Sequence, residues 1–125
     1  MPPSPTCNSA SPPSKTLTME QAYWGMKEFL DKILLQHKQK NSDYAGTETD
    51  GLANFRRTAE RLNLSMPQVF MVLMEKHFQA LENDSKNPNL VLNEGVEDRL
   101  FDVAAYCGLF YLALRENTLT QRKDW

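Results

Sequence analysis

The chain has 125 residues, 41% of them hydrophobic, which is enough to bury roughly two-thirds of the unfolded surface in one core without a metal or disulfide staple. Its 14 basic and 16 acidic side chains leave a net charge of −2. This balance excludes the strongly basic surface with which proteins bind duplex nucleic acid, although a small anionic ligand needs only two or three local cations.

Residues 1–16 form a leader that holds five of the seven prolines and four serines. Such a composition buries too little apolar surface to offset its ordering entropy, so we expect a disordered tail. The leader has no apolar stretch of the secretory type, and the longest apolar run, residues 103–114, is shorter than the roughly 18 to 20 residues that cross a bilayer. With only Cys7 and Cys107, the chain has no disulfide framework, and we expect a soluble, cytoplasmic protein without a membrane partner.

Residues 17–116 show the periodicity of four helices, which predicts one compact all-α domain. The first helix should begin at a capping box, T-M-E-Q, whose N-cap is Thr18, and should run to about Lys40. A loop rich in Ser, Asp, Gly and Thr is expected from residue 41 to residue 51. The second helix is short and should stop at Asn63.

The third and fourth helices also have start signals. Ser65 opens the third with a second capping box, S-M-P-Q, and Asn93 should cap the fourth. The fourth helix, residues 94–115, is apolar on nearly every face from Leu100 to Leu114, which is the pattern of a helix buried on all sides. Three other helices cannot cover it, so we expect a homo-oligomer built through this helix, with residues 117–125 as an unstructured tail.

The stretch KNSDYAG, which begins at Lys40, carries more functional side chains than a turn requires. Turn chemistry explains part of it, because Lys40 complements the helix dipole, Asn41 stops the helix and Asp43 favours a turn. It does not explain Tyr44, a large ring in a polar loop. A similar mixture returns ten residues later in N-F-R-R, residues 54–57.

Four short motifs together resemble a known family. They are KNSDYAG, L-A-N-F-R-R from Leu52, E-K-H from Glu75 and E-D-R-L-F-D-V-A-A-Y from Glu97. This set resembles the nucleotide-modification-associated domain of phages and bacteria, a small helical family with K-N-x-D-Y, N-F, a basic residue on the middle helix and D-x-x-x-Y near the end. The resemblance covers residues 35–114 and implies a phage-type protein that handles phosphorylated nucleosides.

A nucleotide site needs cations for phosphate, an aromatic face for the base, and amides or carboxylates for polar edges. The candidate ligand residues are Lys40, Asn41, Asp43, Tyr44, Asn54, Phe55, Arg56, Lys76 and His77. Besides Lys40, Asn41 and Asp43, which turn chemistry can explain, three of these have a structural alternative. Phe55 and His77 lie on the inner stripes of their helices, which favours the core, and Lys76 beside its stripe is typical of a solvated lysine.

Asp98 and Asp102 lie one turn apart on the fourth helix, and Asp102 falls inside its apolar stretch. A buried carboxylate needs a partner, so Asp102 should form a salt bridge or hold a metal together with Asp98. The candidate salt-bridge partners are Lys40, Arg56 and Lys76. Mg²⁺ is the one cofactor suggested, because all-α nucleoside triphosphate pyrophosphohydrolases hold it between an E-E-x-x-E helix and an E-x-x-D helix. The third helix here has no E-x-x-E, so half of that cage is missing.

We therefore favour a non-catalytic binder of a small phosphorylated nucleotide, one that sequesters a signalling nucleotide in a phage context. The excess of recognition side chains over catalytic ones supports this hypothesis. Two alternatives stay open. One is a Mg²⁺-dependent nucleotide hydrolase or a nucleotide-modification accessory enzyme, and the other is a protein interaction module whose loop residues are structural.

Overall fold

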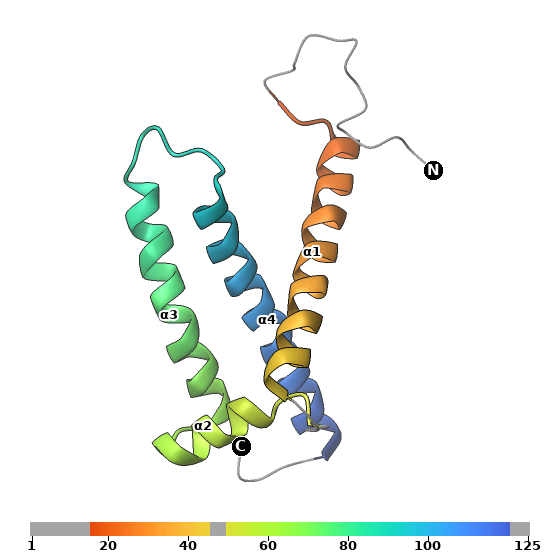
Figure 1. The fold of residues 1–125 in the computed structure, drawn as a ribbon, viewed down its shortest axis with the longest axis vertical. Helices are drawn as coiled ribbons and strands as arrows, with labels where there is room; N and C mark the ends of the chain where they lie inside the picture. Colours follow the sequence, from red (N-terminus) through yellow and green to blue (C-terminus); the bar gives the residue numbers. More distant parts are fainter. Residues whose placement is uncertain (1–15, 46–49, 121–125) are drawn as a thin grey trace.

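The computed structural model describes residues 16–45 and 50–120, and their side chains except at positions 41–45 and 118–120. This part forms four helices: α1 Met19–Ala45, α2 Ala53–Leu62, α3 Met66–Ser85 and α4 Glu94–Thr120. The expected all-α class is confirmed, and no strand occurs in the described ranges (Figure 1). The predicted disorder of the leader falls on residues 1–15, which lie outside these ranges, as do residues 121–125 of the predicted tail.

Two helices are longer than the sequence predicts. α1 continues past Lys40 to Ala45, so Asn41 does not end it. α4 continues to Thr120, so residues 117–120, which we expected in the tail, are helical. No glycine or proline stands at either expected end, and polar residues such as Asn and Ser disfavour a helix only mildly.

The predicted helix starts are confirmed by side-chain hydrogen bonds. Thr18 Oγ1 accepts from the backbone N–H three residues later at 3.1 Å, and the glutamine at that position completes the capping box. Ser65 forms the same box at the start of α3. Asn93 Oδ1 accepts from the backbone N–H of the third residue after it at 3.0 Å. Asn63 ends α2 as predicted, in the left-handed conformation with φ 54° and ψ 47°.

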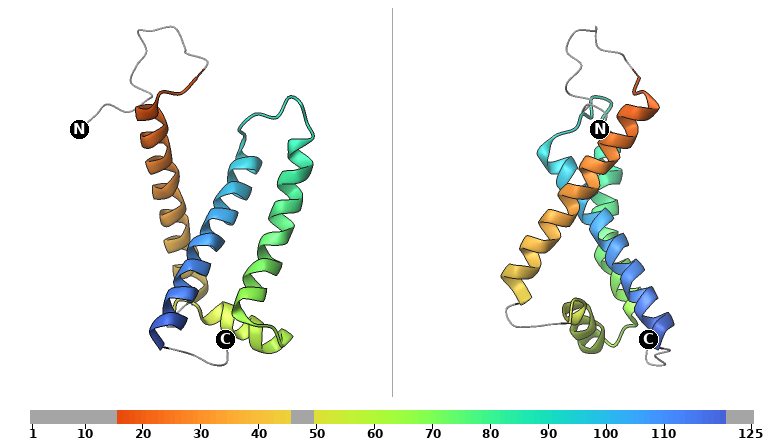
Figure 2. Two further views of the ribbon diagram at one scale, coloured as in Figure 1. Left: turned by 180° about the vertical axis from the view of Figure 1, so that it is seen from behind. Right: turned by 90° about the vertical axis from the view of Figure 1, so that its right-hand side faces the viewer.

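The helices α2, α3 and α4 share one core, and α1 stands apart from it. The packed pairs are α3 with α4, α2 with α3, and α1 with α4 (Figure 1, Figure 2). At the centre, Phe70 of α3 is 0% exposed and stacks on Phe55 of α2, with ring centroids 4.7 Å apart, and on Phe110 of α4 at 5.1 Å. The buried core residues are Leu52, Ala59, Met66, Val69, Phe70, Met74, Leu109 and Ala113.

None of the described side chains of α1 is fully buried. Its ring contact with the rest of the chain is Phe29 on Phe101 of α4, at 5.2 Å. Large apolar side chains stay exposed on α4 as well, among them Tyr111 and Leu112. The described chain therefore does not cover α4 on all faces, and the homo-oligomer stays a prediction. No helix among residues 16–45 and 50–120 combines the length and apolar character needed to span a bilayer.

Replacing Ser65 by alanine should lower the free energy of unfolding by about 1 kcal/mol, because its capping box binds N–H groups at the start of the helix that carries Phe70. The matched control, Thr18→Ala, removes the same box from α1, which among the described helices packs on α4. We expect Thr18→Ala to lower the free energy of unfolding by less than about half as much as Ser65→Ala does, measured by urea denaturation followed by circular dichroism. Equal losses would contradict the weaker attachment of α1.

Candidate functional site

A polar cleft lies between α1 and α4. It encloses about 390 Å³ and is lined by Gln36, Gln39 and Lys40 from α1 and by Asp98 and Asp102 from α4. Residues three and four positions apart share one face of a helix, so the register of both helices turns these polar side chains toward one space. Neither glutamine was among the predicted site residues, although their spacing from Lys40 could have indicated them.

Asp102 is the centre of the contacts at this cleft. Its Oδ1 lies 3.4 Å from Lys40 Nζ, and its Oδ2 lies 3.8 Å from Nδ1 of His77 on α3. Of the three predicted salt-bridge partners, Lys40 is the one observed. The Lys40 side chain is 60% exposed, and a pair of this kind contributes about 0–1 kcal/mol. Lys40 can therefore exchange Asp102 for another anion at little cost.

Tyr106 joins this group, although it was not among the predicted ligand residues. Its ring lies 5.7 Å from the ring of His77 and meets Phe55 edge-on at 6.3 Å. Burial, and then the nearby carboxylate of Asp102, raise the pKa of the Tyr106 phenol. The available signal was the D-x-x-x-Y spacing, which places Tyr106 one turn after Asp102 on the same face of α4.

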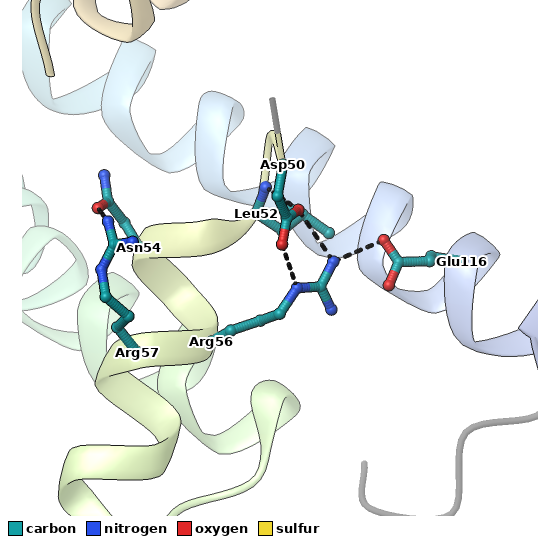
Figure 3. Close-up of polar contacts among 6 residues, drawn as sticks. All are labelled: Asp50, Leu52, Asn54, Arg56, Arg57 and Glu116. Carbon is teal, nitrogen blue, oxygen red and sulfur yellow. Dashed lines mark hydrogen bonds and ion pairs between the residues drawn. The ribbon is translucent and has the colours of Figure 1, made fainter. Parts of the chain in front are cut away.

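Arg56 is held between two carboxylates from different segments (Figure 3). Its Nε donates to Asp50 Oδ2 at 2.7 Å and its Nη2 donates to Glu116 Oε2 at 2.7 Å. Both bonds raise the pKa of the guanidinium, that to Asp50 more. Asp50 also accepts from the backbone N–H of Leu52 at the start of α2, at 3.0 Å. Arg56 therefore ties the start of α2 to α4, and we assign it to the structure and not to the ligand site predicted for it.

Other predicted ligand residues lie away from these contacts of Asp102. Asn54 accepts a hydrogen bond from Arg57, and Figure 3 shows this pair on the side of α2 away from the Arg56 guanidinium. Lys76 is exposed on α3, as its structural alternative predicted. Phe55 packs against the core, again as its alternative predicted. The His77 side chain is 15% exposed on the inner stripe of α3, as its structural alternative predicted, and its Nδ1 also borders Asp102.

The rest of the K-N-x-D-Y motif stands at the end of α1. Asn41, Asp43 and Tyr44 follow Lys40 within the last turns of the helix, where we expected a loop. Their side chains lie outside the described part of the chain, so their place in the site stays a prediction. The helical backbone nevertheless keeps the motif at the same end of α1 as Lys40.

The predicted metal ligands Asp98 and Asp102 line the same cleft, one turn apart. Within the described ranges, no group of three or more His, Cys, Asp and Glu side chains is arranged to hold a metal ion. Mg²⁺ takes one or two carboxylates when substrate phosphates and waters complete its shell. The two aspartates therefore fit a metal ion that binds together with a phosphate better than a metal ion that the protein holds by itself.

Comparison with other proteins adds no relative to this description. No family model, no curated protein and no solved structure matches the chain.

Arg56→Ala should lower the free energy of unfolding by roughly 1 to 2 kcal/mol, because it removes charge-assisted hydrogen bonds to two carboxylates that are only partly exposed. The neighbouring Arg57→Ala is the matched control and should cost less than about 0.5 kcal/mol, since its side chain bonds within α2 on an exposed face. Urea denaturation of both variants measures the difference. Equal losses would mean that the tie between α2 and α4 contributes nothing.

Tyr106 should make stability fall at alkaline pH. Its raised pKa means that the folded state holds the phenol proton more tightly than the unfolded chain, so this stabilisation is full below pH 10.0 and is lost as the pH rises through the pKa of the folded state. Tyr106→Phe should therefore lose less unfolding free energy between pH 9 and pH 11 than the parent, in urea titrations at each pH. The control Tyr111→Phe, which changes an exposed phenol, should follow the parent. A Tyr106→Phe curve parallel to the parent would contradict the assignment.

Proposed function

We propose that the cleft around Asp102 binds a small phosphorylated nucleotide, and that this cytoplasmic, phage-type protein captures the nucleotide without converting it. One observation carries the proposal. Asp102 lines the cleft together with Lys40, contacts His77 and lies one turn before Tyr106, so residues from three of the four motifs that resemble the nucleotide-associated family meet at this carboxylate. Their sequence separation means that helix packing, and not local sequence, brings them together.

The phosphate end of the ligand is assigned to Lys40. Its ammonium group is 60% exposed and makes one loose contact with Asp102, so it can turn to a phosphate oxygen. The cleft volume of about 390 Å³ lies within the range of pockets that hold small molecules. His77 contacts the same carboxylate, with Nδ1 3.8 Å from Asp102 Oδ2, but does not line the cleft.

The nucleoside end is assigned to the carboxylates. Asp98 and Asp102 repel phosphate, so they cannot contact the phosphate group unless a divalent cation lies between the carboxylates and the phosphate. Carboxylates accept hydrogen bonds from ribose hydroxyls and from N–H groups of bases, which are donors without negative charge. The ring of Tyr106, one turn after Asp102 on α4, supplies apolar surface for a base.

The Mg²⁺-dependent alternative has its own supporting observation. Asp98 and Asp102 stand one turn apart in the same cleft as Lys40, which is a suitable arrangement for a cation that bridges two carboxylates and a phosphate. Under this alternative the ligand is a nucleoside di- or triphosphate and its turnover requires Mg²⁺. The binder and the enzyme therefore differ in whether the nucleotide leaves the protein unchanged.

Calorimetric titration with mono-, di-, tri- and cyclic nucleotides, each with and without Mg²⁺, tests the proposal. Lys40→Ala should weaken binding about tenfold or more, since a hydrogen bond to a charged group contributes roughly 1.5–3 kcal/mol. The matched control Lys38→Ala removes an exposed lysine of the same helix that does not line the cleft, and should bind as the parent does.

Binding of no nucleotide, or equal effects of the two lysine substitutions, would overturn the proposal. Mass spectrometry of the nucleotide after incubation separates the two functions. An unchanged nucleotide supports the non-catalytic binder. Mg²⁺-dependent conversion of the nucleotide to a product contradicts the binder and supports the enzyme.

A further inference from the structure

An apolar groove lies between α1 and α4 and shares no lining residue with the polar cleft. It encloses about 300 Å³, and its walls include Leu30, Ile33 and Leu34 of α1 and Ala105, Gly108 and Leu112 of α4. Nearly all of its lining is hydrocarbon, with His37 as the one titratable side chain. Gly108 has open space around it, so the groove is not filled by the described chain at that point.

The groove continues into an apolar stripe along α1. The stripe residues recur every three or four positions and are largely exposed: Met19 92%, Tyr23 65%, Met26 56%, Leu30 55% and Leu34 68%. We call the stripe and the groove together the α1/α4 apolar face. Single exposed apolar residues are normal on a soluble protein, but a stripe this long beside a groove is typical of a binding surface.

We infer that a second copy of this chain covers the α1/α4 apolar face, giving a homodimer. Taking about 200 Å² for a large side chain, the five stripe residues and Leu112 leave roughly 750 Å² exposed on each copy. Stable interfaces bury about 800 Å² per partner, so this face has the size that a dimer needs.

The chain itself offers no other occupant. The segments outside the described ranges are residues 1–15, 46–49 and 121–125, which are rich in Pro, Ser and charged or polar residues and contain few large apolar side chains. They cannot supply the apolar area that the face requires. The occupant must therefore come from outside the chain.

A second copy fits because the face is self-complementary. The stripe of α1 is a ridge and the space between α1 and α4 is a groove, so the ridge of each copy can pack into the groove of the other about a two-fold axis. The exposed side of α1 also carries the ion pairs Lys27–Asp31 and Lys32–Glu28, which balance positive and negative charge. Two such helices can approach without net repulsion.

This dimer would also stabilise the polar cleft. In the described part of the chain, α1 packs on α4 and on no other helix, and it carries Lys40 opposite Asp102. A second copy that holds α1 against α4 therefore holds the two walls of the cleft together. The interface is then a surface that α1 and α4 share, and not residues 94–115 alone as the sequence predicts.

Size-exclusion chromatography with light scattering, from about 1 to 100 μM protein, tests the inference. Interfaces of this size have dissociation constants in the micromolar range or below, so the dimer should be populated at these concentrations. The parent should approach twice the 14.4 kDa of one chain. Leu30→Glu combined with Leu34→Glu should give a monomer with unchanged helical content by circular dichroism. The control Leu62→Glu, at a 52% exposed leucine on α2, should stay dimeric.

The milder variant Leu34→Ala should raise the dimer dissociation constant about threefold or more, and it keeps the test valid if the double variant unfolds. A parent that is monomeric at 100 μM overturns the inference, including a monomer that instead binds phospholipid vesicles. It is equally overturned if Leu34→Ala dissociates no more readily than the Leu62→Glu control.

Discussion

The stacking of Phe70 between Phe55 and Phe110 is the interaction on which the rest of the structure depends. It joins α2, α3 and α4 through one ring that is 0% exposed, with centroid separations of 4.7 and 5.1 Å. Full burial of a phenylalanine stabilises a fold by roughly 1.5–3 kcal/mol, and each aromatic pair adds about 0.5–1.5 kcal/mol. Because Phe55 also meets Tyr106 edge-on, the same packing orients the turn of α4 that carries Asp102. The wall of the cleft on α4 thus stands on a helix that the core holds in place.

The opposite wall has a different origin, because α1 belongs to no part of that core. Within residues 16–45 and 50–120 it packs on α4 and on no other helix, through contacts such as Phe29 on Phe101, and its described side chains are all at least partly exposed. The cleft is therefore a junction between a packed three-helix unit and a helix attached at one face (Figure 2). Sites at such junctions can adjust to a ligand, since less packing energy opposes a small movement of the attached helix.

Two charged contacts of similar type have different roles here. Arg56 makes short bonds to Asp50 and Glu116, which fix α2 to α4 and leave the guanidinium committed. Lys40 makes one longer contact with Asp102 and stays largely exposed. A sequence contains no information on this difference, because both residues stand in similar polar motifs. The geometry distinguishes a cation that builds the fold from one that is available to a ligand.

Local sequence by itself determined where the helices begin and which class of fold results. The capping boxes at Thr18 and Ser65 and the stop at Asn63 were readable because each involves residues within one turn of the backbone. The end of α1 was not readable, since residues 41–44 are weak helix formers without a glycine or proline among them, and small propensities do not decide a boundary. Helical spacing likewise placed Phe55 correctly on an inner face.

Only the tertiary structure decided which of the candidate residues meet. Lys40 reaches Asp102 across 62 positions of sequence, and Arg56 reaches Glu116 across 60. Which of several cations approaches a given carboxylate depends on how α1 and α2 lie against α4. That arrangement results from the packing of many side chains together, and no motif of five or six residues contains it.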